Sequence, residues 1–348
     1  MALDHGKFLP FLLQQPLHTD LPSRPGGNAT NPFTNQTLPY TGFVPIPDYV
    51  PDVILPEMLA LANMGTEIMW CDIGGPNLTA EFAAHYFNSF AAQGKQVLLD
   101  NRCGLPGDFD TPEYASYASV QPRKWESNLG MDPFSYGYNR ATPESAYLTP
   151  AGIVRALMDI ISKNGNFLLD VGPTANGSIL DVEQRALRDA GAWIRSHAEA
   201  IYNTTYWFVT PQEGEALRFT QNADAFYITA LWPPNGTVVV SSPVPWVEGD
   251  EVVVVGGERA GEVVPSRVLG DGRLEITVSE EVREADSLAW VFKIGFGGVM
   301  RGDVGAGTAT SSGGVAEQTA NGAAGSFGGG RGLGVVVAAL LGLAMVIC

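Results

Sequence analysis

Apolar and polar positions follow two different periods along this chain, and the change between them divides it. Short, nearly continuous apolar runs predict buried strands at residues 67–72, 95–102 and 166–172. Apolar residues three or four apart predict helices at residues 78–94, 149–165 and 181–202. Strands and helices that alternate in this way predict a parallel sheet covered by helices.

The predicted helices carry signals for their faces and ends. In the first helix, Phe82, Tyr86 and Phe90 fall on one face, which predicts the side that is buried. In the second helix, Thr149 is placed to cap the N-terminus and Gly165 to end the C-terminus. These signals fix the direction in which each helix packs and the points where the chain can turn.

Beyond about residue 206 the helical period gives way to short runs rich in Val, Ile, Phe and Tyr. Turns that contain Gly, Pro and Asn separate these runs, which lie at residues 217–232, 236–242, 250–257, 273–280 and 287–296. Such a pattern predicts an antiparallel β-sandwich. No cluster of acids or histidines suggests chemistry in this part, so we expect an accessory domain at residues 206–297.

Composition indicates a folded protein without a nucleic-acid partner. A chain of 348 residues, 45% of them hydrophobic, can bury the cores of two ordinary domains. The formal net charge of -17 disfavours binding to phosphate backbones. Cys71, Cys103 and Cys348 form neither a disulfide framework nor a set of metal ligands. Cys71 and Cys103 can be a disulfide or two buried thiols, and we expect no metal and no cofactor.

The sequons and the N-terminus bear on where the protein is located. Glycosylation sequons occur at Asn28, Asn35, Asn77, Asn176, Asn203 and Asn235. Their density favours secretion, although each motif alone is weak. Residues 1–16 nevertheless do not read as a signal peptide, because Asp4 and Pro10 interrupt a short apolar run.

The C-terminal region predicts a membrane anchor. Residues 298–333 are rich in Gly, Ala, Ser and Thr, which is typical of a flexible linker. The apolar tail at 334–348 is shorter than the roughly 20 residues of a membrane span. It matches the cleaved tail of a glycosylphosphatidylinositol (GPI) signal, which has roughly 10–20 apolar residues. We therefore expect a secreted or cell-surface glycoprotein that is held on the membrane by a lipid anchor.

The first predicted strand ends on a carboxylate. Side chains alternate along a strand, so Trp70 and Asp72 point the same way and Cys71 points the opposite way. A ring beside an acid suits a sugar, because the ring packs on the apolar face and the acid meets the anomeric carbon. Arg102, at the end of the next strand, can bind hydroxyls and hold a nearby carboxylate ionised.

Later loops add more acids and aromatic residues to this group. The loop after Arg102 carries three acids, Asp108, Asp110 and Glu113. Further along the chain come Trp125, Glu126, Tyr136 and Tyr138. Carboxylates, aromatic rings and an arginine at the loops of a barrel favour glycoside hydrolysis. Asp108 and Asp110 are better explained as residues that stabilise loop turns.

Six motifs in a fixed order resemble the alpha-L-fucosidases of glycoside hydrolase family 29. They are "WCDIGGPN", "NRCG…DFDTPEY", "RKWES", "SYGYNR", "SKNGNFLLDVGPTANGSI" and "AEAIYNT". The resemblance covers roughly residues 40 to 205. It implies a (β/α)8-type barrel followed by a β-sandwich, and retaining hydrolysis of terminal alpha-L-fucose from fucosylated glycans. The expected fold class is therefore α/β plus all-β.

The resemblance also implies roles for individual residues. The family's nucleophile falls on Asp72, its pocket tryptophan on Trp70 and the arginine of its next strand on Arg102. The acid/base glutamate of one branch falls on Glu113, and Glu126 is the second candidate. Tyr136 matches an aromatic residue that packs against the sugar. Cys103 and Asp170 stand where many members have tryptophan and asparagine, which leaves details of the pocket open.

Only part of a barrel can be counted in this chain. A complete (β/α)8 barrel takes about 250 residues, whereas residues 44–205 supply three or four strand–helix units and residues 1–43 read as loop. We therefore expect the C-terminal half of a barrel, with impaired or absent turnover for the chain on its own. The alternatives are a non-catalytic carbohydrate-binding protein and a structural cell-surface glycoprotein.

Overall fold

The computed structural model describes residues 2–3, 34–36, 48, 50–72, 78–296 and 344–347. Most of the loop-like segment predicted at 1–43, the linker predicted at 298–333 and most of the apolar tail at 334–348 lie outside the described residues. Among the residues that are described, no helix is both long and apolar enough to cross a membrane.

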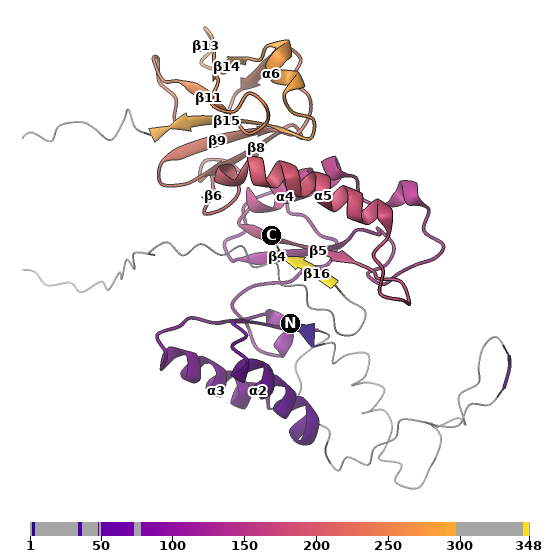
Figure 1. Cartoon of the computed structure of the whole chain (residues 1–348). Helices are drawn as coiled ribbons and strands as arrows, with labels where there is room; N and C mark the ends of the chain where they lie inside the picture. The colour runs from indigo at the N-terminus through magenta and orange to yellow at the C-terminus, as the bar shows by residue number, and fades with distance from the viewer. Residues whose placement is uncertain are drawn as a thin grey trace, which may run out of the picture. The chain divides into compact units, whose positions relative to one another are not determined.

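The chain divides into two compact units, and each is described by itself. The first comprises residues 1–115 and 121–128, and the second comprises residues 116–120 and 129–348 (Figure 1). The second unit thus contains both the later strand–helix elements and the β-rich part. The domain boundaries expected from the sequence stay predictions.

The first unit is built on a short parallel sheet. Its elements are η1 Val50–Ile54, α2 Leu55–Asn63, β2 Ile68–Cys71, α3 Thr79–Ala91, β3 Leu98–Leu99 and the 3-10 turn η2 Asn101–Cys103. Strands β2 and β3 are parallel, with Ile68 opposite Leu98, and α3 connects them. The backbone of β1 (Ala2–Leu3) also pairs in parallel with β2. The unit therefore contains the strand–helix–strand order that the sequence predicts.

Helix α3 buries the face expected from its apolar period. Phe82 and Tyr86 are fully buried and Phe90 nearly so, in one core with Met69 and Leu99 of the strands. The strand predicted at 95–102 is wrong at both ends. β3 includes only Leu98–Leu99, residues 95–97 are not in a strand, and the chain turns through η2 after Asp100. Arg102 therefore lies in a 3-10 turn and not in a strand.

The strand–helix part of the second unit contains two long helices. Its elements are β4 Trp125–Gly130, whose first four residues belong to the first unit, η3 Glu144–Ala146, α4 Pro150–Ile161, β5 Gly165–Val171, α5 Asp181–Ser196 and η4 Ala198–Ala200. On one edge of β5, Met131 N donates to Asp170 O, and the backbone of β16 (Ala344–Ile347) pairs antiparallel on the other.

One of the two end signals of α4 is correct. Thr149 Oγ1 accepts the N–H of Gly152 at 3.1 Å, as expected for an N-cap. The C-terminal signal is wrong, because α4 ends at Ile161 and Gly165 already begins β5. The left-handed turn between them is made by Asn164, with φ of 73°. Asparagine tolerates this conformation better than most residues, so it replaces the expected glycine.

The β-rich part is the antiparallel sandwich that the sequence predicts. One sheet contains β6 Thr205–Tyr206, β7 Gln212–Glu213, β8 Leu217–Gln221, β9 Ala225–Ala230, β11 Val252–Val255, β12 Val263–Val264 and β15 Trp290–Gly295. The other contains β10 Thr237–Val240, β13 Ser266–Val268 and β14 Leu274–Thr277. The short helix α6 (Glu280–Glu284) follows β14. Aromatic and β-branched side chains from both sheets form one core.

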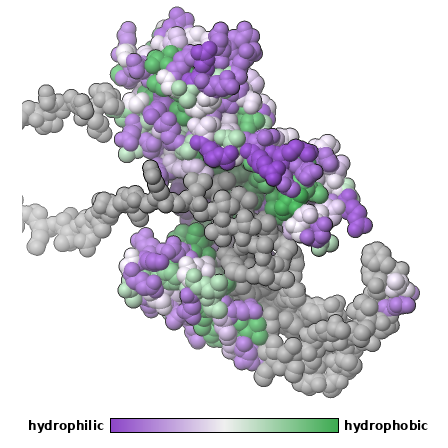
Figure 2. Space-filling model, in the orientation of Figure 1, coloured by the Kyte–Doolittle hydropathy of each residue, from purple (hydrophilic) through white to green (hydrophobic). Residues whose placement is uncertain are grey.

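Helices α4 and α5 are fastened to the sandwich within the second unit. Trp193 Nε1 of α5 donates to Ala289 O at 3.0 Å, and His197 Nε2 lies 3.0 Å from Asp286 Oδ2. Asp159 of α4 pairs with Arg218 of β8 at 2.7 Å and with Lys163 at 2.6 Å. Figure 2 shows hydrophilic residues over the outer face of α5 and hydrophobic residues gathered beneath it. Polar contacts therefore fix where these helices meet the sheet.

The two ion pairs of Asp159 should contribute strongly to stability, because Lys163 and Arg218 are both buried. We expect Asp159→Asn to lower the free energy of unfolding by about 3–5 kcal/mol, since it leaves two buried charges uncompensated. Urea unfolding followed by circular dichroism measures the change. The matched control is Glu262→Gln, which breaks the exposed Arg259–Glu262 pair and should cost under about 1 kcal/mol. Equal losses in the two variants would contradict this account.

Candidate active site

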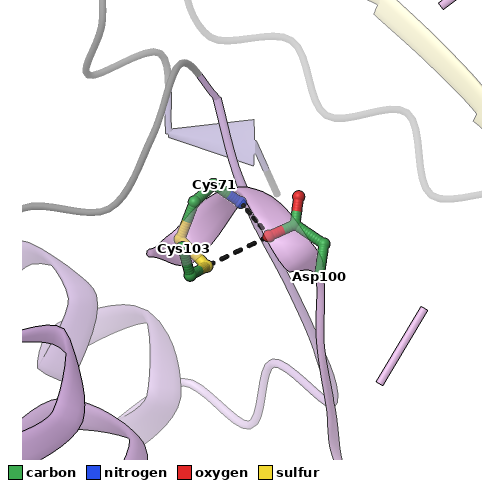
Figure 3. Close-up of side chains that lie close together, drawn as sticks. All are labelled: Cys71, Asp100 and Cys103. Atoms are coloured by element: carbon green, nitrogen blue, oxygen red, sulfur yellow. Dashed lines mark hydrogen bonds between the residues drawn. A yellow bond between two sulfur atoms is a disulfide. The ribbon is translucent and has the colours of Figure 1, made fainter. Parts of the chain in front are cut away.

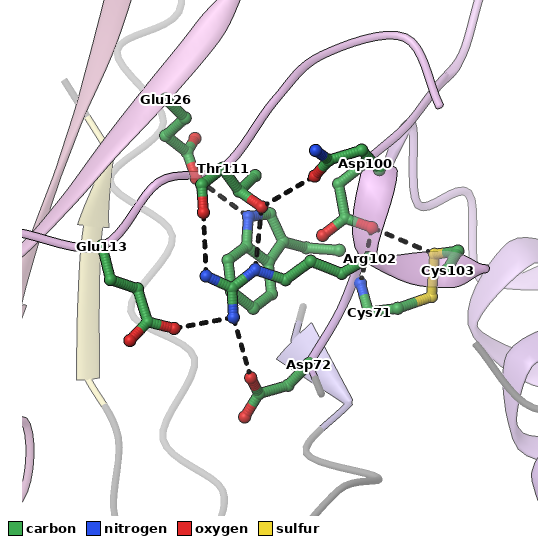
Figure 4. Close-up of polar contacts among 10 residues, drawn as sticks. Cys71, Asp72, Asp100, Arg102, Cys103, Thr111, Glu113 and Glu126 are labelled. Carbon is green, nitrogen blue, oxygen red and sulfur yellow. Dashed lines mark hydrogen bonds and ion pairs between the residues drawn. A yellow bond between two sulfur atoms is a disulfide. The ribbon is translucent and has the colours of Figure 1, made fainter. Parts of the chain in front are cut away.

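Three segments of the first unit bring the predicted catalytic residues together. Asp72 directly follows β2, and Arg102 lies in η2. The segment that carries Glu113 runs beside residues 125–128, through bridges between Asp110 and Trp125 and between Glu113 and Asn128. Residues 73–77, which follow Asp72, lie outside the described residues. The positions of these segments place the side chains of Asp72, Arg102 and Glu113 around one point (Figure 4).

One nitrogen of Arg102 contacts both carboxylates. Nη1 lies 3.3 Å from Asp72 Oδ1 and 2.7 Å from Glu113 Oε1. The two oxygens therefore lie no more than about 6.0 Å apart. Retaining glycosidases hold their two carboxyl groups roughly 5–5.5 Å apart, and inverting ones roughly 6.5–9.5 Å. The observed limit fits the retaining class.

The rest of the Arg102 guanidinium is held by Thr111. Nε donates to Thr111 Oγ1 and Nη2 donates to Thr111 O, both at 2.8 Å. Thr111 is buried, and its hydroxyl donates in turn to Asn101 Oδ1 at 3.1 Å. Asn101 Nδ2 donates to Asp110 Oδ1 at 3.0 Å. With two of its nitrogens fixed by one buried residue, the planar fork presents Nη1 to the carboxylates.

Trp70 lies against the same guanidinium and is itself fixed by Glu126. Arg102 Cζ is 4.6 Å from the centre of the indole ring, a cation–π contact. Trp70 Nε1 donates to Glu126 Oε1 at 2.9 Å, and both residues are buried. Glu126 therefore orients the ring, whereas Glu113 has a side chain that is 44% exposed and can reach a ligand.

Asp100, which directly precedes η2, is fully buried. Its Oδ1 accepts the N–H of Cys71 at 3.1 Å, and its Oδ2 has no hydrogen-bond partner among the described residues. Burial raises the pKa of Asp100 to about 7 from the 3.8 of a free aspartate. The Cys71 N–H and the charge and N–H of Arg102 oppose the shift, and the charge of Glu126 adds to it. At neutral pH this carboxyl therefore lies near its titration midpoint.

Cys71 and Cys103 are joined by a disulfide, which settles the alternatives left by the sequence (Figure 3). Their sulfurs and the carboxylate of Asp100 form the single three-residue grouping, among the described residues, with the spacing of metal ligands. Since the disulfide uses both thiolates, this grouping offers a metal ion only the carboxylate.

One predicted site residue, Tyr136, and two loop acids need separate mention. Tyr136 is half-buried in the second unit, close to Gly172, and its role at the sugar stays a prediction. Asp108 and Asp110 stabilise loops, as expected. Asp108 Oδ2 accepts the N–H of Leu99 at 2.8 Å, while Asp110 contacts Asn101 and Arg123.

The sequence reading missed Thr111 and Asp100. Asp100 follows an apolar strand just as Asp72 does, so the same signal was present in the sequence. Thr111 gives no such signal, because a threonine in a loop has many structural uses. The contact between Trp70 and Glu126 joins residues 56 positions apart, and no spacing rule predicts it.

The site thus consists of a carboxylate pair around an arginine, next to an indole. Residues 24–199 match the model of the Alpha-L-fucosidase family, which is half of the chain. The chain therefore belongs to the alpha-L-fucosidase family.

Individual relatives agree with this assignment. Human plasma alpha-L-fucosidase is 29% identical over 218 residues, which are 58% of this chain and 46% of that protein. The tissue alpha-L-fucosidase of Macaca fascicularis is 31% identical over 203 residues, 55% of this chain and 43% of that protein. The chain thus spans about half the length of the curated relatives it matches.

Solved structures of the family have a similar fold. The Thermotoga maritima alpha-fucosidase in complex with a mechanism-based inhibitor matches with a TM-score of 0.59 and 29% identity, over 70% of this chain and 56% of that one. The same enzyme in complex with fucose matches with a TM-score of 0.58 and 27% identity, over 72% and 60%. The likeness confirms the expected fold class of an α/β part with a β-sandwich.

The raised pKa of Asp100 predicts how stability depends on pH. The folded protein keeps this proton up to about pH 7, whereas the unfolded chain loses it near pH 3.8. The unfolded state therefore binds fewer protons between these values, and the stabilising effect of the neutral carboxyl is lost as pH rises from about 4 to 7.

We expect Asp100→Asn to remove this loss. The stability of the variant relative to wild type should rise by on the order of 2–4 kcal/mol between pH 4 and 7.5. Urea unfolding at several pH values measures this difference, with the exposed-site variant Glu67→Gln as control. Asp170, whose pKa burial also raises to about 7, contributes equally to both proteins and cancels. A difference that is constant across the range would contradict the prediction.

Proposed function

We propose that this chain carries the catalytic pair of a retaining alpha-L-fucosidase. The observation that carries the proposal is the shared contact of Arg102 Nη1 with Asp72 and Glu113, beside Trp70. It sets the two acids at a separation that fits retention. The substrate class, a terminal alpha-L-fucoside on a glycan, is supported by the family and by the fucose complex of a solved relative.

The chemistry has two steps. In the first, a carboxylate oxygen of Asp72 attacks the anomeric carbon and forms a fucosyl ester, while Glu113 gives a proton to the departing glycan oxygen. In the second, Glu113 takes a proton from water, which attacks the same carbon and releases fucose and the free Asp72 carboxylate. Trp70 packs against the Arg102 guanidinium and lines the site beside the sugar. Arg102 holds Asp72 in place and bonds to sugar hydroxyls.

Glu113 is the better acid/base candidate of the two glutamates. Its side chain is partly exposed and reaches the same Arg102 nitrogen as the nucleophile. Glu126 is buried and already accepts the indole N–H of Trp70. For proton donation, Glu113 has to turn from Arg102 toward the leaving oxygen, so we infer that a bound sugar takes its place on the guanidinium.

The finer features of the fold and location belong to the same proposal. The parallel β2–α3–β3 unit and the family match support assignment of residues 44–205 to the C-terminal half of a (β/α)8 barrel. The sequons and the apolar tail support a glycosylated cell-surface protein on a GPI anchor. The four sequon asparagines among the described residues, Asn35, Asn176, Asn203 and Asn235, are all exposed.

The nucleophile is tested by its removal. Asp72→Gly should lower kcat on an aryl alpha-L-fucoside by at least about 10³-fold, because the covalent ester cannot form. Azide should restore part of the turnover by attacking the anomeric carbon, with a beta-fucosyl azide as product. Near-wild-type turnover by Asp72→Gly, or fucose binding without turnover by wild type, would contradict the proposal.

The acid/base assignment is tested by comparing the two glutamates. Glu113→Gln should lose about 10²–10⁴-fold on glycan substrates but far less on an aryl fucoside with a good leaving group, which needs no proton. Glu126→Gln keeps the length of the side chain and an acceptor oxygen for Trp70. It should therefore show the same change on both substrates. A leaving-group dependence in Glu126→Gln and not in Glu113→Gln would reverse the assignment.

A further inference from the structure

The Cys71–Cys103 disulfide joins the residue before Asp72 to the residue after Arg102. The bond spans 32 residues and joins the end of β2 to η2, with the two Cα atoms 5.0 Å apart. Both cysteines are fully buried and belong to the core beneath the site. The covalent link therefore ties together the backbones from which Asp72 and Arg102 project.

Asp100 adds a second tie between the same two backbones. It directly precedes η2, and its Oδ1 accepts the N–H of Cys71 in β2 at 3.1 Å. The same Oδ1 lies 3.1 Å from Cys103 Sγ. A disulfide sulfur has no hydrogen, so this approach is a packing contact when the bond is closed (Figure 3). The buried carboxyl thus contacts the residue next to Asp72 and the residue next to Arg102.

The contacts of both features lie away from Arg102 Nη1, where Asp72 and Glu113 meet. In Figure 4 the disulfide and Asp100 lie on one side of Arg102, and Asp72 and Glu113 contact its far end. Their effect on the reaction has to pass through the backbone. A displacement of a catalytic group by about 1 Å can cost 10²-fold in rate, so a clamp on this backbone has a measurable consequence.

We propose that the Cys71–Cys103 disulfide and the Asp100 carboxyl form a positioning clamp, in which the disulfide sets the spacing between the strand end and the 3-10 turn, and Asp100 sets their relative orientation. The clamp rests on the proposed function only for the roles of Asp72 and Arg102. The clamp itself concerns only local structure: the disulfide and the Asp100 hydrogen bond hold residues 68–72 and 98–103 in register.

The experiment starts with the full chain and a check of the bond. Alkylation under denaturing conditions should leave Cys71 and Cys103 unmodified before reduction and modify both afterwards. The variants are Cys71→Ala/Cys103→Ala, which removes the covalent tie, Asp100→Leu, which removes the acceptor, and Asp100→Asn, which keeps an acceptor oxygen. Met58→Ala is the control, because it creates a cavity in the same core by shortening a side chain of α2 and leaves both the disulfide and the Asp100 carboxyl in the sequence.

The readout that does not depend on activity is amide hydrogen exchange. In the double cysteine variant and in Asp100→Leu, exchange should rise at least about 10-fold in residues 68–72 and 98–103, while α3 keeps its protection. Met58→Ala should raise exchange in α3 as well. At about pH 4, where the Asp100 carboxyl is protonated, Asp100→Asn should stay within about 3-fold of wild type.

The second readout is turnover at a temperature where all variants are folded. The double cysteine variant and Asp100→Leu should lose about 10–100-fold in kcat with little change in KM, whereas Met58→Ala keeps the wild-type kcat. Equal exchange in α3 and the two segments, an unchanged local exchange, or Asp100→Asn behaving like Asp100→Leu would overturn the clamp. If hydrogen exchange changes as expected but the wild-type protein shows no turnover, the result supports the clamp and counts against the proposed function.

Discussion

The Arg102 guanidinium is the group on which the arrangement of the site depends. It has five N–H groups in one plane, and the structure uses them in two directions. Thr111 takes Nε and Nη2, while Asp72 and Glu113 meet at Nη1. Two carboxylates at this spacing would repel each other strongly without a cation between them. The fixed charge therefore allows the two carboxylates to occupy one small site.

The burial of Asp100 costs desolvation free energy when the carboxyl is ionised. A carboxyl with one orphaned oxygen in a core is unfavourable as an anion, and this is why its pKa rises. The same burial shields its bond to Cys71 from water, so the geometry at the end of β2 is well defined. A surface residue in this place would make a weaker and more mobile contact.

In the second unit, partly buried polar contacts hold helices α4 and α5 against the sandwich. Helices α4 and α5 must lie against a sandwich whose own core is complete without them. Apolar packing alone would tolerate several positions of the helices. One of them is specified by Asp159 with its two buried cationic partners, and by the bond from Trp193 to Ala289. The ion pairs contribute to specificity here, at a desolvation cost that the apolar contacts offset.

The sequence alone determined the elements whose signals are local. The apolar period of α3, the Thr149 cap, the β-rich runs after residue 206 and the acid at the end of β2 each depend on near neighbours in the chain. The motifs around Asp72, Arg102 and Glu113 also indicated the family. The tertiary structure decided what depends on distant partners. Asn164, and not Gly165, makes the left-handed turn after α4, because Gly165 is already the first residue of β5. Thr111, Asp100, the disulfide and the bond between Trp70 and Glu126 join residues far apart in sequence, and only the folded backbone brings them within bonding distance.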